Sequence, residues 1–217
     1  MPLKAILWDN DGVLSDTERL FYTVNRDYFR SLGVELSERD FYDCFLADSR
    51  GAWHRLDCSP SEIAIHRDER NRLYLERLMS GDDWITPGMG DVIAALPMSL
   101  RMGVVTSASR THFDAIHRNS GLLDRFEFVL AEGDYARPKP APDPYLTGLS
   151  RLGLPPEACV AIEDSPRGVE AAVAAGLQVI AIRTSLSQWA EFSGAWRVVD
   201  RPSEVGAILA AMYTSAA

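Results

Sequence analysis

Five short runs of apolar residues recur along the chain and predict the strands of a buried sheet. The runs cover residues 4–8, 100–105, 126–131, 159–162 and 178–182. Strands this apolar are typical of parallel sheets, in which helices cover both faces. Helical patterns join the later runs, over residues 110–121, 142–153 and 165–176. This alternation predicts a Rossmann-like α/β fold with a parallel sheet, right-handed crossovers and helices on both faces.

Two helices in the C-terminal half have recognisable sequence signals. Ser165 is placed as an N-cap, Pro166 occupies the first helical position and Gly176 marks the stop. The alanine-rich segment 206–217 predicts a closing helix. Both signals agree with the alternation of strands and helices.

The interval between the first and second apolar runs has a different pattern. Residues 15–88 contain no convincing strand, but two segments have apolar residues at helical spacing. These are Leu20, Val24, Tyr28 and Leu32 in the first, and Ile63, Leu73, Leu75 and Leu78 in the second. We interpret residues 15–88 as an inserted all-helical cap domain and residues 1–14 with 89–217 as the core domain. The proline and glycines of segment 85–92 predict the return hinge.

The composition is that of an ordinary globular protein. Its 217 residues, 47% of them hydrophobic, suffice for one core domain with a smaller insert. The formal net charge of −9 argues against nucleic acid or an anionic membrane as the main partner, because either requires a clustered basic surface. Three widely spaced cysteines suggest neither a disulfide framework nor a zinc site. With no long apolar window and no export signal, we expect a soluble cytoplasmic monomer.

Polar residues gather just beyond four of the predicted strands. In chain order these are Asp9 with Asp11, residues 106–109, Lys139, and Glu163 with Asp164. Because the carboxyl ends of parallel strands share one sheet edge, we expect the four clusters to converge beneath the cap. Each cluster alone has a simpler explanation as a turn, a helix cap, a solvated lysine or a helix start. The complete set in this order favours one active site.

Together these side chains could bind a phosphate group and a divalent cation. Asp9 and Asp164 supply the hard oxygen ligands that Mg²⁺ prefers, and the ion would relieve their mutual repulsion. Lys139 and Ser107 could hold a phosphate, with backbone amides after Ser107 as further donors. The Asp9 carboxylate could attack phosphorus in line and form an aspartyl-phosphate. Asp11 could protonate the leaving oxygen and later accept a proton from water.

The whole chain resembles the haloacid dehalogenase superfamily, in the branch with a small helical cap. That branch includes sugar phosphatases, phosphoglycolate phosphatase and β-phosphoglucomutase. The motif DxDGxxxDTE reads here as residues 9–18, and the second motif is Ser107 after VVT. The third motif is Lys139 in KPAPDPY, and the fourth is the acidic pair in IEDSPRGVEAA. The resemblance implies a Mg²⁺-dependent phosphatase that hydrolyses a small phosphorylated metabolite, such as a sugar phosphate or a related phospho-acid.

The resemblance also implies the role of each acidic residue. Asp9 is expected to be the nucleophile and Asp11 the general acid and base. The expected Mg²⁺ ligands are Asp9, the backbone carbonyl of Asp11, and Asp164, with Glu163 reaching the ion through water. An acidic residue at position 11 is absent from dehalogenases that cleave carbon–halogen bonds, so it favours phosphorus chemistry.

The same resemblance indicates which residues touch the substrate. On the phosphate side these are Lys139 and the residues Ser107, Ala108 and Ser109, which belong to a lining segment that extends to Thr111. On the cap side they are Asp16, Thr17 and Arg50, which lies beside Ser49 where the family places a specificity loop. Arg50 could equally be a surface charge on a helix.

Two alternatives stay open at this stage. One is a sugar-phosphate mutase, although the chain has Leu20 and Phe21 where β-phosphoglucomutase carries a histidine in its first cap helix. The other is a phosphometabolite-binding protein without turnover. The four histidines show no metal-binding spacing and favour surface or helix roles: His54, His66, His112 and His117. Asn10, between the two aspartates, is commonly apolar in the family, and the sequence offers no physical account of it.

Overall fold

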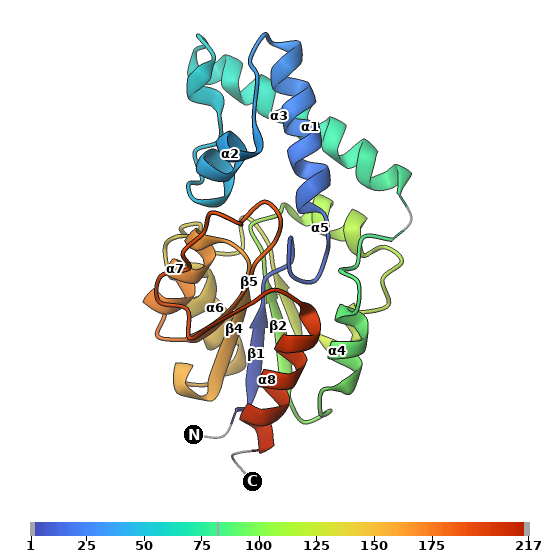
Figure 1. Cartoon of the computed structure of the whole chain (residues 1–217), viewed down its shortest axis with the longest axis vertical. Helices are drawn as coiled ribbons and strands as arrows, with labels where there is room; N and C mark the ends of the chain where they lie inside the picture. The colour runs from blue at the N-terminus through green and yellow to red at the C-terminus, as the bar shows by residue number, and fades with distance from the viewer. Residues whose placement is uncertain (1–2, 82, 215–217) are drawn as a thin grey trace.

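The computed structural model describes residues 3–81 and 83–214, with an α/β core below a helical cap (Figure 1). All neighbouring strands of the core sheet are parallel, in the order β3-β2-β1-β4-β5-β6. The strands are β1 (Ala5–Trp8), β2 (Arg101–Val105), β3 (Phe128–Leu130), β4 (Cys159–Glu163), β5 (Gln178–Ile182) and β6 (Arg197–Val199). The predicted Rossmann-like fold and its five strands are confirmed. Strand β6 has no predicted counterpart because only Val199 of its three residues is buried.

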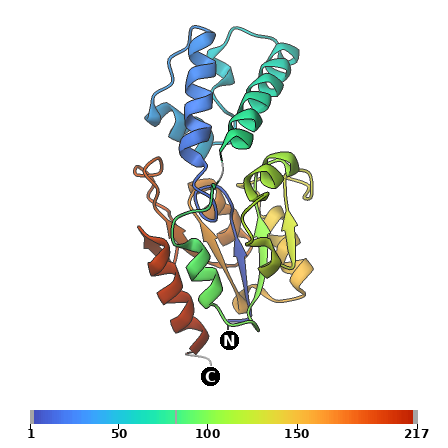
Figure 2. The same cartoon turned by 90° about the vertical axis from the view of Figure 1, so that its right-hand side faces the viewer.

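Helices cover both faces of the sheet, as Figure 2 shows with the sheet between them. On one face lie α4 (Met89–Ala95) and α8 (Pro202–Thr214), and on the other lie α6 (Asp143–Leu152) and α7 (Pro166–Ala174). Alternate residues of β1 face the two layers: Ile6 and Trp8 pack with the first pair, and Ala5 and Leu7 with the second. Such strands are buried on both faces, which is why they are apolar at every position.

The helix ends agree with most of the signals in the sequence. Ser165 caps α7 by accepting a hydrogen bond from the Gly168 amide (3.2 Å), and Pro166 is its first residue. Helix α5 (Arg110–His117) ends four residues earlier than predicted because the chain turns at Ser120. Helix α8 begins four residues before the predicted segment 206–217, of which residues 215–217 lie outside the described chain. Two 3₁₀ turns complete the core, at Leu123–Arg125 and Pro156–Ala158.

The cap is formed by the chain between β1 and α4. It contains α1 (Glu18–Ser31), α2 (Glu38–Phe41), a π-helical turn (Tyr42–Leu46), a 3₁₀ turn (Trp53–Arg55) and α3 (Pro60–Ser80). Helices α1 and α3 match the two segments with predicted helical spacing. No helix in the described part of the chain is long and apolar enough to cross a membrane.

Two connections between cap and core run side by side and antiparallel. The Asp16 amide donates to the Trp84 carbonyl (2.8 Å), and the Thr86 amide donates to the Leu14 carbonyl (3.0 Å). A bridge between Ser15 and Ile85 lies between these bonds. The cap is therefore tethered at the carboxyl end of β1, directly over the sheet edge where ligands bind in open α/β folds.

Candidate active site

The predicted polar clusters meet at the carboxyl edge of the sheet. Asp9 follows β1, Ser107 lies just after β2, Lys139 lies between β3 and α6, and Asp164 follows β4. A pocket of about 430 Å³ opens between this edge and the cap, with walls from both. The fold therefore brings the acidic residues and the expected phosphate-binding residues together from segments that are far apart in the chain.

Three carboxylates form the floor of the site. Asp9, Glu163 and Asp164 are buried, and each offers an oxygen within 4.8 Å of the others. Gly12 makes this proximity possible, because a Cβ there would lie 1.8 Å from Asp164 Oδ2. Its φ of +75° also favours glycine. The Asp11 side chain is not part of this cluster. Only the backbone carbonyl of Asp11 is expected to bind a cation.

The cluster has more negative than positive charge. Burial and the neighbouring Glu163 raise the pKa of Asp9 to about 7, although Lys139 opposes the shift. Burial, with Glu18 and Asp9 nearby, raises the pKa of Asp164 well above its usual value. Carboxylate oxygens are the ligands that Mg²⁺ prefers, and a divalent cation would offset the excess charge. The donor set therefore fits a divalent cation.

Lys139 is fully buried between two of these acids. Its Nζ lies 3.0 Å from Asp9 Oδ1 and 2.6 Å from Glu163 Oε1, and it donates to the Val105 carbonyl (2.9 Å). The Tyr145 hydroxyl also donates to Glu163 Oε1 (2.6 Å). Burial opposes ionisation of Glu163, but Lys139 outweighs it and lowers the pKa of that carboxyl. Glu163 thus fixes the ammonium next to Asp9.

The segment after β2 presents hydroxyls and amides to the pocket. Ser107, Ala108 and Ser109 all line it. Ser109 also caps α5, accepting a hydrogen bond from the His112 amide (3.3 Å), so the simpler helix-cap explanation holds for this residue as well. Arg167 of α7 donates to Ser107 Oγ (3.1 Å) and lines the same wall. This arginine was not predicted, because its position in α7 carries no distinctive sequence signal.

Asp11 is held by two side chains, one just after β1 of the core and one just before α1 of the cap. Thr17 Oγ1 donates to Asp11 Oδ1 (2.5 Å), and Asn10 Nδ2 donates to Asp11 Oδ2 (3.3 Å). Thr17 is itself fully buried and shares a hydrogen bond with the hydroxyl of Ser15 (3.0 Å). The predicted substrate contact Thr17 therefore lies against Asp11, and it is not among the residues that line the pocket.

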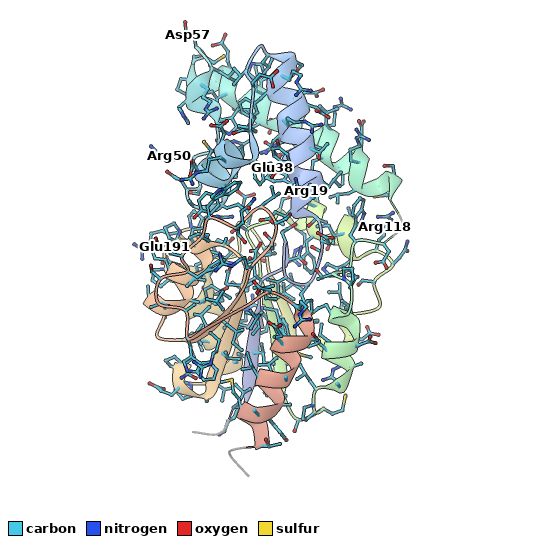
Figure 3. The ribbon with its side chains drawn as sticks, in the orientation of Figure 1. Arg19, Glu38, Arg50, Asp57, Arg118 and Glu191 are labelled. Carbon is cyan, nitrogen blue, oxygen red and sulfur yellow. The ribbon has the colours of Figure 1, made fainter. Side chains whose placement is uncertain are left out.

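Two other predicted cap contacts are not brought to the pocket. Asp16 is exposed at the hinge. The Arg50 side chain is 83% exposed and pairs with Asp48. Figure 3 shows Arg50 on the outer side of the cap. Its loop reaches the pocket through Ser49 and Gly51 instead. The expectation that Arg50 contacts the substrate finds no support in this arrangement, because a nearby carboxylate holds its charge at the surface.

Arg70 of α3 is the buried positive charge that the cap presents to the pocket, which the exposed Arg67 of the same helix also lines. The side chain is buried, and it donates to Asn25 Oδ1 (2.7 Å) and Asn71 Oδ1 (3.1 Å). Its guanidinium lies over the Phe21 ring (4.7 Å), and burial lowers its pKa to about 10. No carboxylate in the described residues forms an ion pair with it. The sequence signal for Arg70 is weak, since α3 carries charged residues on most of its surface.

Glu18 completes the acidic side of the pocket from the cap. It begins α1, accepts a hydrogen bond from the Thr184 hydroxyl (2.6 Å) and lines the pocket near Asp164. Burial raises the pKa of Glu18 to about 7, although its hydrogen bonds with Thr184 and Asp164 oppose the shift. The motif contains Glu18, but no role was predicted for it.

Fold and site define an α/β protein with a buried acidic centre under a helical cap, whose carboxylates could hold a cation. A sequence model described as haloacid dehalogenase-like hydrolase matches residues 6–182, so the chain belongs to this hydrolase family. The predicted resemblance is confirmed.

Relatives cover almost the whole chain. Protein CbbY of Rhodobacter capsulatus is 35% identical over 217 residues, covering 92% of this chain and 94% of the relative. A crystal structure of CbbY from Rhodobacter sphaeroides, in complex with xylulose 1,5-bisphosphate, is similar with a TM-score of 0.81. It is 29% identical and covers 94% of this chain and 96% of that one. β-Phosphoglucomutase of Bacillus subtilis is 25% identical over 192 residues, covering 83% of each chain.

Proposed function

We propose that this protein is a Mg²⁺-dependent phosphatase that hydrolyses a small phosphorylated metabolite through an aspartyl-phosphate at Asp9. The observation that carries this proposal is the position of Asp9, a buried carboxylate that lines the pocket and lies 3.0 Å from the Lys139 ammonium. Family membership and the sugar bisphosphate bound to CbbY support the same class of substrate.

The residues of the pocket divide the reaction between them. Asp9 attacks phosphorus, while Lys139 and Ser107 hold the phosphoryl oxygens with the amides that follow β2. Asp11 protonates the leaving oxygen in the first half of the reaction. In the second half it accepts the proton of the water that attacks the phosphoryl group on Asp9. Closure of the cap over the pocket would exclude bulk water during these steps.

The expected cation ligands are Asp9, Asp164 and the backbone carbonyl of Asp11, with Glu163 close by. When bound, Mg²⁺ would neutralise charge on the phosphoryl group and orient it. A bound cation would also favour the ionised form of Asp9, which burial disfavours.

A screen of phosphorylated metabolites tests the proposal. We expect the purified protein to release inorganic phosphate from p-nitrophenyl phosphate and from at least one sugar phosphate or phospho-acid when Mg²⁺ is present. Chelation should abolish the release and added Mg²⁺ should restore it. A lack of hydrolysis across the panel would contradict the proposal. If phosphate analogues raise the unfolding temperature but no turnover is seen, the protein would instead be a phosphometabolite-binding protein.

A mutase is the second candidate, supported by the similarity to β-phosphoglucomutase. Helix α1 contains no histidine, and its apolar Phe21 lines the pocket. Product analysis separates the two activities. A mutase would isomerise a hexose 1-phosphate, with a requirement for traces of bisphosphate and no net phosphate release.

The buried Arg70 narrows the substrate class. A buried cation without an anionic partner is costly, so its position in the pocket wall favours a ligand that brings a negative charge. Asp9 and Lys139 are expected to hold the reacting phosphate at the sheet edge, and Arg70 lies across the pocket in the cap. We infer that the substrate carries a second anionic group, a phosphate or a carboxylate, distant from the reacting one.

Arg70→Met is expected to raise KM for such a substrate by roughly 10–100-fold, the equivalent of a charged hydrogen bond of about 1.5–3 kcal/mol. KM for a matched monophosphate should change much less. Methionine retains apolar contact with Phe21, so the cap should stay folded. The control is Arg72→Met, on the exposed side of α3 between Glu69 and Glu76. Equal changes in KM for both substrates would show that Arg70 does not bind a second anionic group of the substrate.

A further inference from the structure

A chain of buried polar side chains leads away from Asp11 into the core. Asn10 is fully buried, and its Oδ1 lies 2.7 Å from Nε2 of His117, a residue that is 5% exposed at the end of α5. His117 Nδ1 in turn lies 3.0 Å from Ser120 Oγ. On the other side, Asn10 Nδ2 donates to Asp11 Oδ2. The chain therefore runs from Ser120 through His117 and Asn10 to Asp11.

Hydrogen-bond chemistry fixes the direction of each bond. A carboxylate only accepts, so the Asn10 amide nitrogen must face Asp11 and its oxygen must face His117. The imidazole then carries its proton on Nε2 and donates it to Asn10. His117 Nδ1 is left to accept the proton of the Ser120 hydroxyl. Burial lowers the pKa of His117 to about 4, which agrees with a neutral ring.

Packing alone does not explain these two polar side chains. An unpaired buried amide or imidazole costs about 1–3 kcal/mol, and an apolar residue would fill the same space without that cost. Each member of the chain is instead satisfied by the next. The Asn10 carbonyl also accepts from the amides of Val13 and Ser15, so its backbone is fixed as well as its side chain.

The two oxygens of Asp11 therefore have holders on different parts of the molecule. Thr17, which holds Oδ1, is the residue before α1 of the cap. Asn10, which holds Oδ2, is fixed by His117 from helix α5 of the core. Movement of the cap would carry Thr17 with it, whereas the bond from Asn10 belongs to the core.

We propose that Asn10 and His117 are positioning residues that keep the Asp11 carboxylate directed toward the leaving-group oxygen. Neither touches the substrate. His117 fixes the Asn10 amide, and the amide restricts rotation of the Asp11 side chain. The proposal rests on the proposed function, because it assigns Asp11 the role of general acid.

The test uses the dependence of rate on the leaving group. p-Nitrophenolate departs readily without protonation, whereas an alkoxide requires it, so only alkyl phosphates depend strongly on a well-placed acid. Since a positioned general acid contributes ~10²–10⁴-fold, partial misplacement should lower kcat/KM for the alkyl phosphate by about 10-fold. Asn10→Leu and His117→Leu should show this loss, with much less change for p-nitrophenyl phosphate. KM should stay nearly constant.

Four further variants complete the design. His117→Gln retains a donor toward Asn10 and should recover most of the rate, and Ser120→Ala should have a smaller effect than His117→Leu. The double variant Asn10→Leu with His117→Leu should be no slower than either single variant, because the two residues act as one unit. Phe113→Leu changes packing against the His117 ring, at 4.5 Å between ring centroids, and should lower stability without any leaving-group effect.

The outcomes separate this inference from the proposed function. Failure of the wild-type protein to hydrolyse any phosphate ester would overturn the function itself. If the wild type is active but Asn10→Leu slows both substrates equally, or neither, the positioning role is wrong. Additive losses in the double variant would also overturn it. If the leucine variants fail to fold, Ser120→Ala gives the same comparison with a smaller expected loss for the alkyl phosphate, and an equal effect on both substrates would overturn the positioning role.

Discussion

Asp9→Asn is expected to abolish turnover while leaving the fold intact. An amide cannot form the aspartyl-phosphate, and loss of a nucleophile costs at least about 10⁴-fold in kcat. Stability should not fall, because burial already disfavours the charged form of Asp9 and raises its pKa to about 7. Steady-state kinetics with Mg²⁺ and thermal unfolding measure the two effects separately.

Trapping the intermediate makes this prediction sharper. Rapid acid quenching during turnover should leave one phosphoryl group on the wild-type protein, seen by intact mass, and none on the Asp9→Asn variant. The matched control is Asp68→Asn, an exposed acid on α3, which should keep wild-type turnover. Wild-type turnover in the Asp9→Asn variant would exclude Asp9 as the nucleophile.

The core of the fold could be predicted because its strands are buried on both faces. Burial makes β1, β4 and β5 apolar at nearly every position, a pattern that is visible without neighbours. Edge strands lack this signal, and β6 has two exposed residues of three. The short helix α2 and the π-helical turn after it were also missed, since four or five residues are too few to show helical periodicity.

The floor of the site could be predicted because sheet topology alone determines where strands end. Parallel strands bring Asp9, Ser107 and Asp164 to one edge whatever the surrounding side chains do. The cap side depends instead on the direction of side chains, which spacing does not fix. Thus the sequence left Arg50 equally as a substrate contact or a surface charge, and gave no reason to select Arg70, which is buried in the pocket wall.

Asn10 illustrates a second limit of sequence reasoning. Its partner His117 lies 107 residues away and carries no spacing signal of its own. The helix role predicted for His117 is compatible with its place at the end of α5, but a surface role is not, because the side chain is buried. A buried hydrogen bond between two residues that are distant in the sequence can be recognised only from the tertiary structure.

Lys139→Met is expected to lower both stability and turnover, and the two losses should separate in a double variant. Removing the ammonium leaves Asp9 and Glu163 buried without a cation, which should cost ~3–5 kcal/mol in the free energy of unfolding. Turnover should fall by roughly 10²–10³-fold, because the group that holds the phosphoryl oxygens is lost. Urea unfolding without Mg²⁺ and kinetics with Mg²⁺ provide the two measurements.

Adding Glu163→Gln to Lys139→Met removes one of the two carboxylate charges that Lys139 neutralises. The free energy of unfolding should then recover in part, because the amide still accepts a hydrogen bond from Tyr145 and no longer needs a counter-ion, whereas Asp9 still lacks its cation. Turnover should not recover, since neither methionine nor glutamine can hold the phosphate. The control is Lys4→Met, an exposed lysine, which should change neither quantity. If the double variant regains activity together with stability, Lys139 acts only by neutralising Glu163, and its assignment as a phosphate holder is wrong.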